Sequence, residues 1–144
     1  MSRGLSTGVR NTGGGRRQDM QTTTPMIEAL SHYLDLSSLE LKASAQNMAN
    51  VDTPGYRTTG FDFAAEMGRC LDSLGHGSDD ASTAPSTTPR LGPVDGLLER
   101  PDGNNVSMDR EGLQMAEAQL QFRTGVELLK HEFTRVADAI HEDK

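Results

Sequence analysis

The sequence predicts a mainly α-helical protein, in which a long N-terminal helix and a long C-terminal helix pack as a coiled-coil-like hairpin around a disordered polar middle. Two stretches near the ends of the 144-residue chain carry apolar residues at steps of three and four, which is the spacing of one helix face. The middle contains four of the six prolines and a run of small polar residues, as in segments that have no core of their own. Aromatic residues make up only 4% of the chain and Trp is absent, so a large independent core is not expected.

Residues 1–24 are predicted to form a disordered basic N-terminal arm. Four arginines stand against one acid, Asp19, and glycines are frequent. The arm could be a functional basic segment, an export signal or an inert tail. The sequence also leaves open whether translation starts at Met1, Met20 or Met26.

Residues 25–63 are predicted to hold the N-terminal helix and a following turn. Thr24 is a favourable N-cap, and Pro25 fits the first helical position because the amide hydrogen that it lacks is not needed there. Ser37 and Ser44 interrupt the apolar face. The seam of this helix consists of Ile27, Leu30, Leu34, Leu41, Ala45 and Met48.

This first helix should end near Asn50. Thr53 precedes a proline, which disfavours the α-helical backbone at Thr53. Pro54 and Gly55 suit the two central positions of a type II turn, since Gly55 can adopt the positive φ that the second position requires. Residues 56–63 then alternate loosely and could form a short extended segment.

Residues 64–105 are predicted to be a flexible polar linker rich in Pro, Gly, Ser and Thr. Leu97 and Leu98 could form a minor anchor within it. The residues at positions 102–105, Asp-Gly-Asn-Asn, are typical of a turn and come directly before the last helix.

Residues 106–144 carry the strongest pattern of the sequence and are predicted to form a heptad helix. Ser107 can cap this helix, and Asp109 and Glu111 are favourably placed in its first turn. Apolar residues then recur at alternating steps of four and three, as in a coiled coil. The seam positions are Met108, Gly112, Met115, Gln119, Phe122, Val126, Leu129, Phe133, Val136 and Ile140.

Small residues flank this seam at positions where a two-stranded coiled coil usually has Glu or Lys. They include Ala116, Ala118, Gly125, Ala137 and Ala139. Small flanks allow more than one neighbour to approach closely. Each buried seam side chain contributes about 1.5–3 kcal/mol, whereas each ordered residue costs about 1–2 kcal/mol in backbone entropy. A hairpin of the two helices alone is therefore expected to be marginal, and neighbouring chains would complete the core.

Composition and spacing argue against several classes of function. A net charge of −7 and a pI near 5.0 disfavour nucleic-acid binding. No run of about 18 apolar residues predicts a membrane span, and the N-terminus lacks the apolar stretch of a secretory signal peptide. Cys70 is the single cysteine, and His131-Glu132 lacks the second histidine of a zincin helix. We therefore expect no catalytic, metal or cofactor site.

Residues 47–57, with the sequence NMANVDTPGYR, resemble a signature of the bacterial flagellar rod and hook proteins. In that family an N-terminal helix ends at Asn-x-Ala-Asn-x-x-Thr-Pro-Gly-Tyr, and a C-terminal heptad helix closes the chain. Both ends match here, over about residues 25–63 and 103–140. The short chain without an inserted β-domain is most similar to the proximal rod proteins. The motif residues are Asn47, Ala49, Asn50, Thr53, Pro54, Gly55 and Tyr56.

The resemblance implies a structural subunit of the flagellar basal-body rod, which self-assembles through its terminal helices and transmits torque across the periplasm. The implied partners are further copies, other rod subunits, the rod adaptor and membrane-ring proteins, and the flagellar export apparatus, which would export it without a cleaved signal peptide. Asn47 and Asn50 would then tie the helix end to the next loop, and Tyr56 would make a contact at the bend. The alternative class is a soluble coiled-coil adaptor or export chaperone that binds one partner helix.

Overall fold

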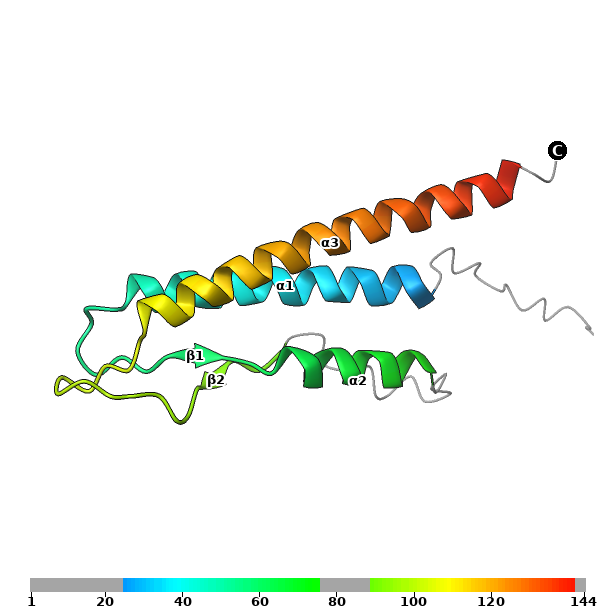
Figure 1. The fold of residues 1–144 in the computed structure, drawn as a ribbon. Coiled ribbons are helices and arrows are strands. Elements are labelled where there is room, and N and C mark those ends of the chain that lie inside the picture. The colour runs from blue at the N-terminus through cyan, green and yellow to red at the C-terminus, as the bar shows by residue number, and fades with distance from the viewer. Residues whose placement is uncertain (1–24, 76–88, 142–144) are drawn as a thin grey trace, which may run out of the picture.

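The computed structural model describes residues 25–75 and 89–141, which contain three helices and one two-stranded sheet. The elements are α1 (Pro25–Ala49), β1 (Thr59–Gly60), α2 (Phe63–Gly75), β2 (Gly92–Pro93) and α3 (Met108–His141). The helices α1 and α3 pack side by side and antiparallel, which confirms the predicted mainly helical hairpin (Figure 1). The predicted basic arm, the Thr24 cap and residues 76–88 of the predicted linker lie outside the described residues.

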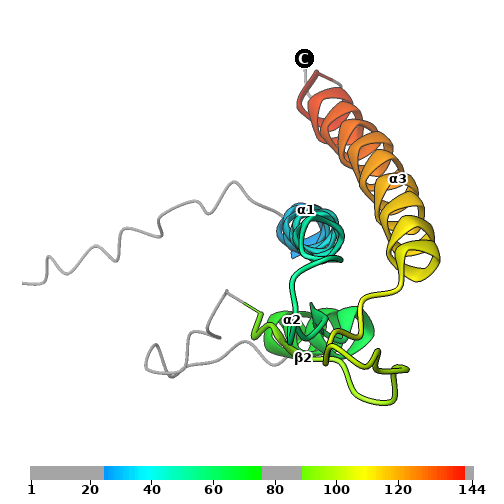
Figure 2. The ribbon, with the colours of Figure 1, turned by 90° about the vertical axis from the view of Figure 1, so that its left-hand side faces the viewer.

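The helix α1 is the central element of the described fold, because it packs against both α3 and α2 (Figure 2). Ser37 and Ser44, which interrupt the predicted seam, are buried with 0% and 1% of their surface exposed. The hydroxyl of Ser37 donates a hydrogen bond to the carbonyl oxygen of Tyr33 at 2.8 Å, so its burial leaves no unpaired donor. The remaining buried residues of α1 are Ile27, Ala29, Leu36, Ala43 and Asn47.

The extended segment expected after the first helix is short. Its regular part is β1, which pairs antiparallel with β2 in the register Thr59 to Pro93 and Gly60 to Gly92. A further backbone bond, from the amide of Val94 to the carbonyl oxygen of Thr58 at 2.9 Å, extends the contact by one step. This small sheet brings residues 92–94, part of the predicted linker, alongside β1, the strand that follows α1.

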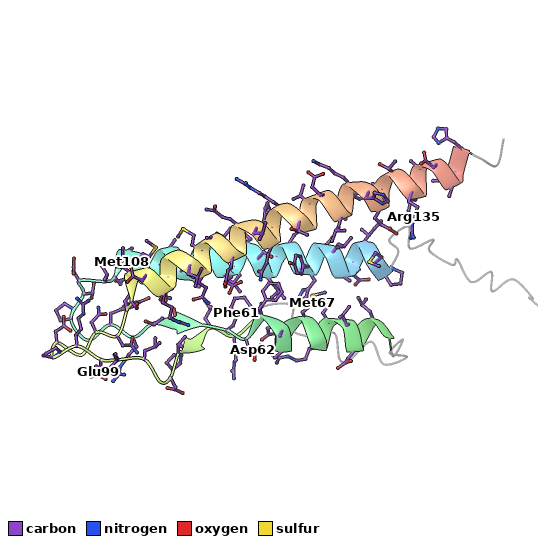
Figure 3. All side chains as sticks on the ribbon, viewed as in Figure 1. Phe61, Asp62, Met67, Glu99, Met108 and Arg135 are labelled. Atoms are coloured by element: carbon purple, nitrogen blue, oxygen red, sulfur yellow. The ribbon has the colours of Figure 1, made fainter. Side chains whose placement is uncertain are left out.

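The helix α2 occupies the first part of residues 64–105, which the sequence predicts to be a flexible polar linker. Asp62 caps this helix, because its Oδ1 accepts a hydrogen bond from the amide of Ala65 at 2.9 Å. The ring of Phe63 packs edge-on against Tyr33 of α1, with centroids 5.3 Å apart. Phe61 and Met67 lie in the space between α1 and α2 (Figure 3).

The helices α1 and α3 differ in length, with 25 and 34 residues. At about 1.5 Å per residue, α3 is longer by roughly 13 Å, and its last turns extend past the start of α1 (Figure 1). The two helices diverge in that direction. Within the described ranges, none of the helices combines the length and the apolar character that crossing a membrane requires.

Candidate assembly surface

Asn47 connects the end of α1 to two other parts of the chain. Its side chain is 1% exposed, and its amide group donates to the carbonyl oxygen of Thr59 at 2.8 Å and to Glu111 Oε2 at 2.9 Å. Its Oδ1 accepts hydrogen bonds from the Thr59 amide at 3.0 Å and the Tyr56 hydroxyl at 3.1 Å. The helix α1, strand β1 and the first turn of α3 therefore meet at one side chain.

Asn104 makes a second connection, from the loop before α3 to the turn after α1. It is fully buried, and its Nδ2 donates to the carbonyl oxygens of Asn50 at 2.9 Å and Thr53 at 2.8 Å. Its Oδ1 accepts from the amide of Val106 at 2.8 Å. Asn104 thus adds a second hydrogen bond to two carbonyl oxygens that already accept backbone amides within the turn, and it joins that turn to a loop 54 positions further along the chain.

Asn105 and Thr58 form a third connection. The Thr58 amide donates to Asn105 Oδ1 at 2.7 Å, and the Thr58 hydroxyl donates to the Asn105 carbonyl oxygen at 3.2 Å. We call the buried side chains that make these connections the polar cluster. The polar cluster consists of Asn47, Thr58, Asn104, Asn105 and Glu111, with the half-buried Tyr56.

Glu111 is the charged member of the polar cluster, and its side chain is 0% exposed. Arg110 donates to Glu111 Oε1 at 3.0 Å, while Asn47 occupies Oε2. A buried carboxylate is tolerated only when its oxygens are paired in this way. From the sequence, Glu111 is expected only to be a favourable acidic residue in the first turn of the helix. Asp102, Asn104 and Asn105, which come just before that helix, are the signal from which a polar cluster could have been predicted.

The turn expected at Pro54 and Gly55 is present. The Tyr56 amide donates to the Thr53 carbonyl oxygen at 3.2 Å, and Gly55 has a φ of 72°. Gly103 crosses directly over this turn, and a Cβ there would lie 3.4 Å from the Gly55 Cα. The two loops therefore approach each other through glycine backbones.

The other motif residues remain at the surface. Asn50 is half-buried and makes local bonds, to the carbonyl oxygen of Gln46 at 2.8 Å and from the hydroxyl of Thr53 at 3.2 Å. Ala49 and Pro54 are exposed. The structure thus brings Asn47 and Tyr56 together in the polar cluster, whereas the rest of the motif shapes the turn.

The row of α3 that faces α1 differs from the predicted seam. Its buried residues repeat every seven positions and are Glu111, Ala118, Gly125 and Glu132. At Gly125 a Cβ would lie 2.8 Å from Leu34 Cδ2 and 3.0 Å from Tyr33 Cδ1. Ala118 and Gly125 are two of the small flanking positions, and their size lets the helices approach closely.

The predicted seam of α3 lies beside this contact row and is largely exposed. Phe122, Phe133 and Ile140 are 38%, 55% and 66% exposed, so exposure rises toward the end of α3 that diverges from α1 (Figure 1). The other predicted apolar seam positions of the two helices fall into three groups. Ile27 is buried; Leu30, Leu34, Leu41, Met48, Met115, Val126, Leu129 and Val136 are half-buried; Ala45 and Met108 are exposed.

The seam residues of α1 lie on one flank of its contact with α3. An α-helix turns by about 100° per residue, so Leu34, Leu41 and Met48 fall on one side of the line of contact. Tyr33 falls on the other side, where it packs against Phe63 of α2. The apolar flank of α1 therefore points away from α2.

The same rotation applies to α3. Met115, Phe122 and Val126 fall on one flank of the contact row, whereas Gln114 falls on the other and donates to Glu40 Oε1 at 3.3 Å. Because the helices are antiparallel, the apolar flanks of both lie on the same side of the hairpin. We call that side the front face. Its residues are Leu34, Leu41, Met48, Met115, Phe122, Val126, Phe133 and Ile140.

On the opposite side, Glu40 and Gln121 have buried oxygen atoms without a hydrogen-bond donor in the described part of the chain. These atoms are Glu40 Oε2 and Gln121 Oε1. Burial raises the pKa of Glu40 above its ordinary value of 4.5; the bond from Gln114 opposes this effect, and the nearby charge of Glu117 adds to it. Buried polar atoms at the contact between α1 and α3 therefore have fewer hydrogen-bond partners here than at the polar cluster.

Residues with chemical reactivity do not gather in the described ranges. Burial raises the pKa of the Cys70 thiol, and the charge of Glu28 adds to that rise, so the reactive thiolate is disfavoured. No cluster of three or more His, Cys, Asp or Glu suited to a metal ion occurs among the residues that the structure describes. The features that stand out are the polar cluster and the front face.

Comparison with known proteins gives a consistent result. No protein-family model matches the chain. It is 32% identical over 115 residues to the flagellar basal body rod protein FlgB of Salmonella typhimurium, a match that covers 67% of this chain and 78% of that protein. The FlgB proteins of Escherichia coli and Borrelia hermsii are 32% and 26% identical over 108 and 125 residues, and this chain covers 78% and 91% of them.

These relatives carry one name, and the matched share of their length includes most of each protein. The long helices at the two ends of the described chain, and the turn at residues 53–56 that follows the first of them, agree with the signature found in the sequence. The chain therefore belongs to the FlgB family of flagellar basal body rod proteins.

Proposed function

We propose that this chain is a structural subunit of the flagellar rod that assembles through the front face of α1 and α3. The observation that carries the proposal is the position of the heptad residues. In both helices they point to the same side of the hairpin, where Phe122, Phe133 and Ile140 remain more than a third exposed. Exposed apolar surface of this kind marks an interaction site.

Magnitudes support assembly over a free-standing hairpin. Complete burial of a Phe or Ile side chain contributes about 1.5–3 kcal/mol, so covering the front face yields a free energy similar to the whole stability of a small domain. Neighbouring helices in a rod would supply that cover. The heptad spacing allows those neighbours to pack as in a coiled coil.

The proposal includes the setting in which the chain works. As a rod subunit it would lie in the periplasmic part of the basal body, contact copies of itself and other rod subunits, and transmit torque. The rod adaptor, the membrane-ring proteins and the export apparatus are further proposed partners, with export that needs no cleaved signal peptide. The polar cluster would keep the two helices in a fixed register while the front face is covered.

A motility experiment tests this proposal. Replacing Phe122 of the front face, or the half-buried Leu129 of the predicted seam beside it, by Asp should abolish rod formation and swimming in a flagellated cell that has no other copy of the gene. A carboxylate buried without a partner at a subunit contact costs several kcal/mol. Rod formation would be measured by electron microscopy of purified basal bodies.

Leu71→Asp is the matched control, since Leu71 is 52% exposed but lies on α2, away from the front face. It should leave swimming intact. Normal swimming of the Phe122→Asp variant would contradict the proposal. The alternative, an adaptor or chaperone for one partner helix, predicts a small discrete complex by light scattering and no place for the protein in purified rods.

A further inference from the structure

Two buried acceptor atoms at the contact between α1 and α3 have no donor in the described part of the chain. They are Glu40 Oε2 and Gln121 Oε1. An ionised carboxylate oxygen and an amide carbonyl oxygen both accept hydrogen bonds, and neither can donate one. Buried polar atoms in folded proteins nearly always have a partner. One added proton, placed between these two oxygens, would satisfy both.

The register of the two helices shows where Glu40 lies along α3. Asn47 of α1 bonds to Glu111 of α3, so these residues face each other. Because the helices are antiparallel, seven residues before Asn47 correspond to seven residues after Glu111. Glu40 is therefore level with Ala118, a residue of the contact row that is 0% exposed.

Gln114 and Gln121 lie on either side of that level. They are seven residues apart, which places them on the same flank of α3 and about 10 Å from each other along its axis, with Glu40 between them. Gln114 donates to Glu40 Oε1 at 3.3 Å. The other oxygen of the carboxyl group, Oε2, is thus left for the side on which Gln121 lies.

The surroundings of Glu40 favour a neutral carboxyl group. Burial raises its pKa, the bond from Gln114 opposes this rise, and the charge of Glu117 on α3 adds to it. Within the described ranges, no charge on α2 or on the two strands contributes to this balance, and no cation does. The hydroxyl of Ser37, one turn away on α1, already donates to the carbonyl oxygen of Tyr33.

We infer that Glu40 carries a proton in the closed hairpin and donates it from Oε2 to Gln121 Oε1, so that a protonated carboxyl group joins the middle of α1 to α3. Both buried acceptors are then paired. When the proton is lost, two acceptor oxygens face each other without a donor, and the helices separate at this level. The divergence of α3 from α1 then begins nearer to the polar cluster, so the opening of the hairpin depends on pH.

A titration of Glu40 in the full chain tests the bond, with the carbon-13 resonance of its carboxyl group as the readout. Gln121→Met keeps the size of the side chain but removes the acceptor. The midpoint should fall by about 0.5–1 pH unit, the equivalent of one hydrogen bond to the neutral form. Gln114→Met is the matched control on the same flank. It removes a donor to the carboxylate, so its midpoint should rise.

A distance measurement tests the opening. Spin labels attached at Ser31 of α1 and Leu128 of α3, both exposed, would report the separation of the helices in a chain that carries Cys70→Ser. The distance should be longer above the Glu40 midpoint than below it. Glu40→Gln should keep the shorter distance at every pH, because its amide can donate to Gln121 as the protonated acid does.

Three results would overturn the inference. A higher midpoint in Gln121→Met would mean that Gln121 donates to an ionised carboxylate through its amide nitrogen. An unchanged midpoint would mean that no bond joins the two side chains, and a spin-label distance that is the same on both sides of the midpoint would mean that the contact does not open. Met is a strong helix former, so both Met variants should keep the helix content of the unchanged chain by circular dichroism.

Discussion

The two ends of the helical hairpin are held in different ways. At the end that contains the polar cluster, Asn47 joins α1 to α3 by a buried hydrogen bond, and the bonds of Asn104 and Asn105 join the segment after α1 to the loop before α3. At the other end the same helices diverge, and apolar residues such as Ile140 are exposed. Directional bonds fix one geometry, whereas apolar contact accepts several neighbours. We therefore interpret the first as the end that sets the shape and the second as the end that is left for partners.

The largest effect is expected from breaking the polar cluster. Asn47→Ala removes the donor of Glu111 Oε2 and the acceptor of the Thr59 amide, and leaves both groups buried. The free energy of unfolding should fall by about 3 kcal/mol or more, measured by urea denaturation. Asn50→Ala is the control, since its side-chain bonds are local; a loss above about 1 kcal/mol there would remove the contrast.

A smaller effect is expected where the helices approach most closely. Gly125→Ala places a methyl group against Leu34 and Tyr33, and overpacking of this kind costs about 1–3 kcal/mol. Gly112→Ala in the same helix meets nothing within 4 Å and should gain up to about 1 kcal/mol from helix propensity. Thermal denaturation of both variants gives the difference. Equal midpoints would show that the contact at Gly125 is loose.

The smallest effect is expected at Glu40, whose buried Oε2 has no hydrogen-bond donor among the described residues. The pKa of Glu40 is raised in the folded chain, so the folded state holds its proton in a pH range where the unfolded state has lost it. Stability should therefore decline as pH rises from about 4.5, the ordinary value, through the raised pKa, and then level off. Glu40→Gln should remove this decline and be more stable at pH 7 by no more than about 1 kcal/mol. An unchanged pH profile of unfolding would contradict this.

The sequence predicted the two long helices because a heptad pattern and an N-cap followed by proline are local signals. It also predicted the turn at Pro54 and Gly55, for the same reason. It missed α2, although Phe63, Met67, Cys70 and Leu74 follow helical spacing, because that helix is short and has no fully buried residue. The polar composition around it outweighed this weak pattern.

The contact row of α3 could not be predicted in the same way. The apolar pattern identifies the residues whose burial would be favourable. Which of them α1 buries depends on the angle between the two helices. That angle depends on long-range contacts, such as the hydrogen bond between Asn47 of α1 and Glu111 of α3, which lie 64 positions apart. Buried Glu111 is invisible to a search for apolar residues for the same reason. The assembly residues named from the sequence stay a prediction until the variants are measured.

The position of the diverging end has a practical consequence for labelling experiments. The helix α1 begins and α3 ends at that same end of the hairpin (Figure 1). A fluorescent protein inserted directly before α1 or directly after α3 would therefore be attached near the surface that partners need, and a loss of swimming could come from steric hindrance alone. Leu98 is 96% exposed in the loop near the opposite end, so a small dye attached there through an introduced cysteine, with Cys70 replaced, would report on the protein with the least interference.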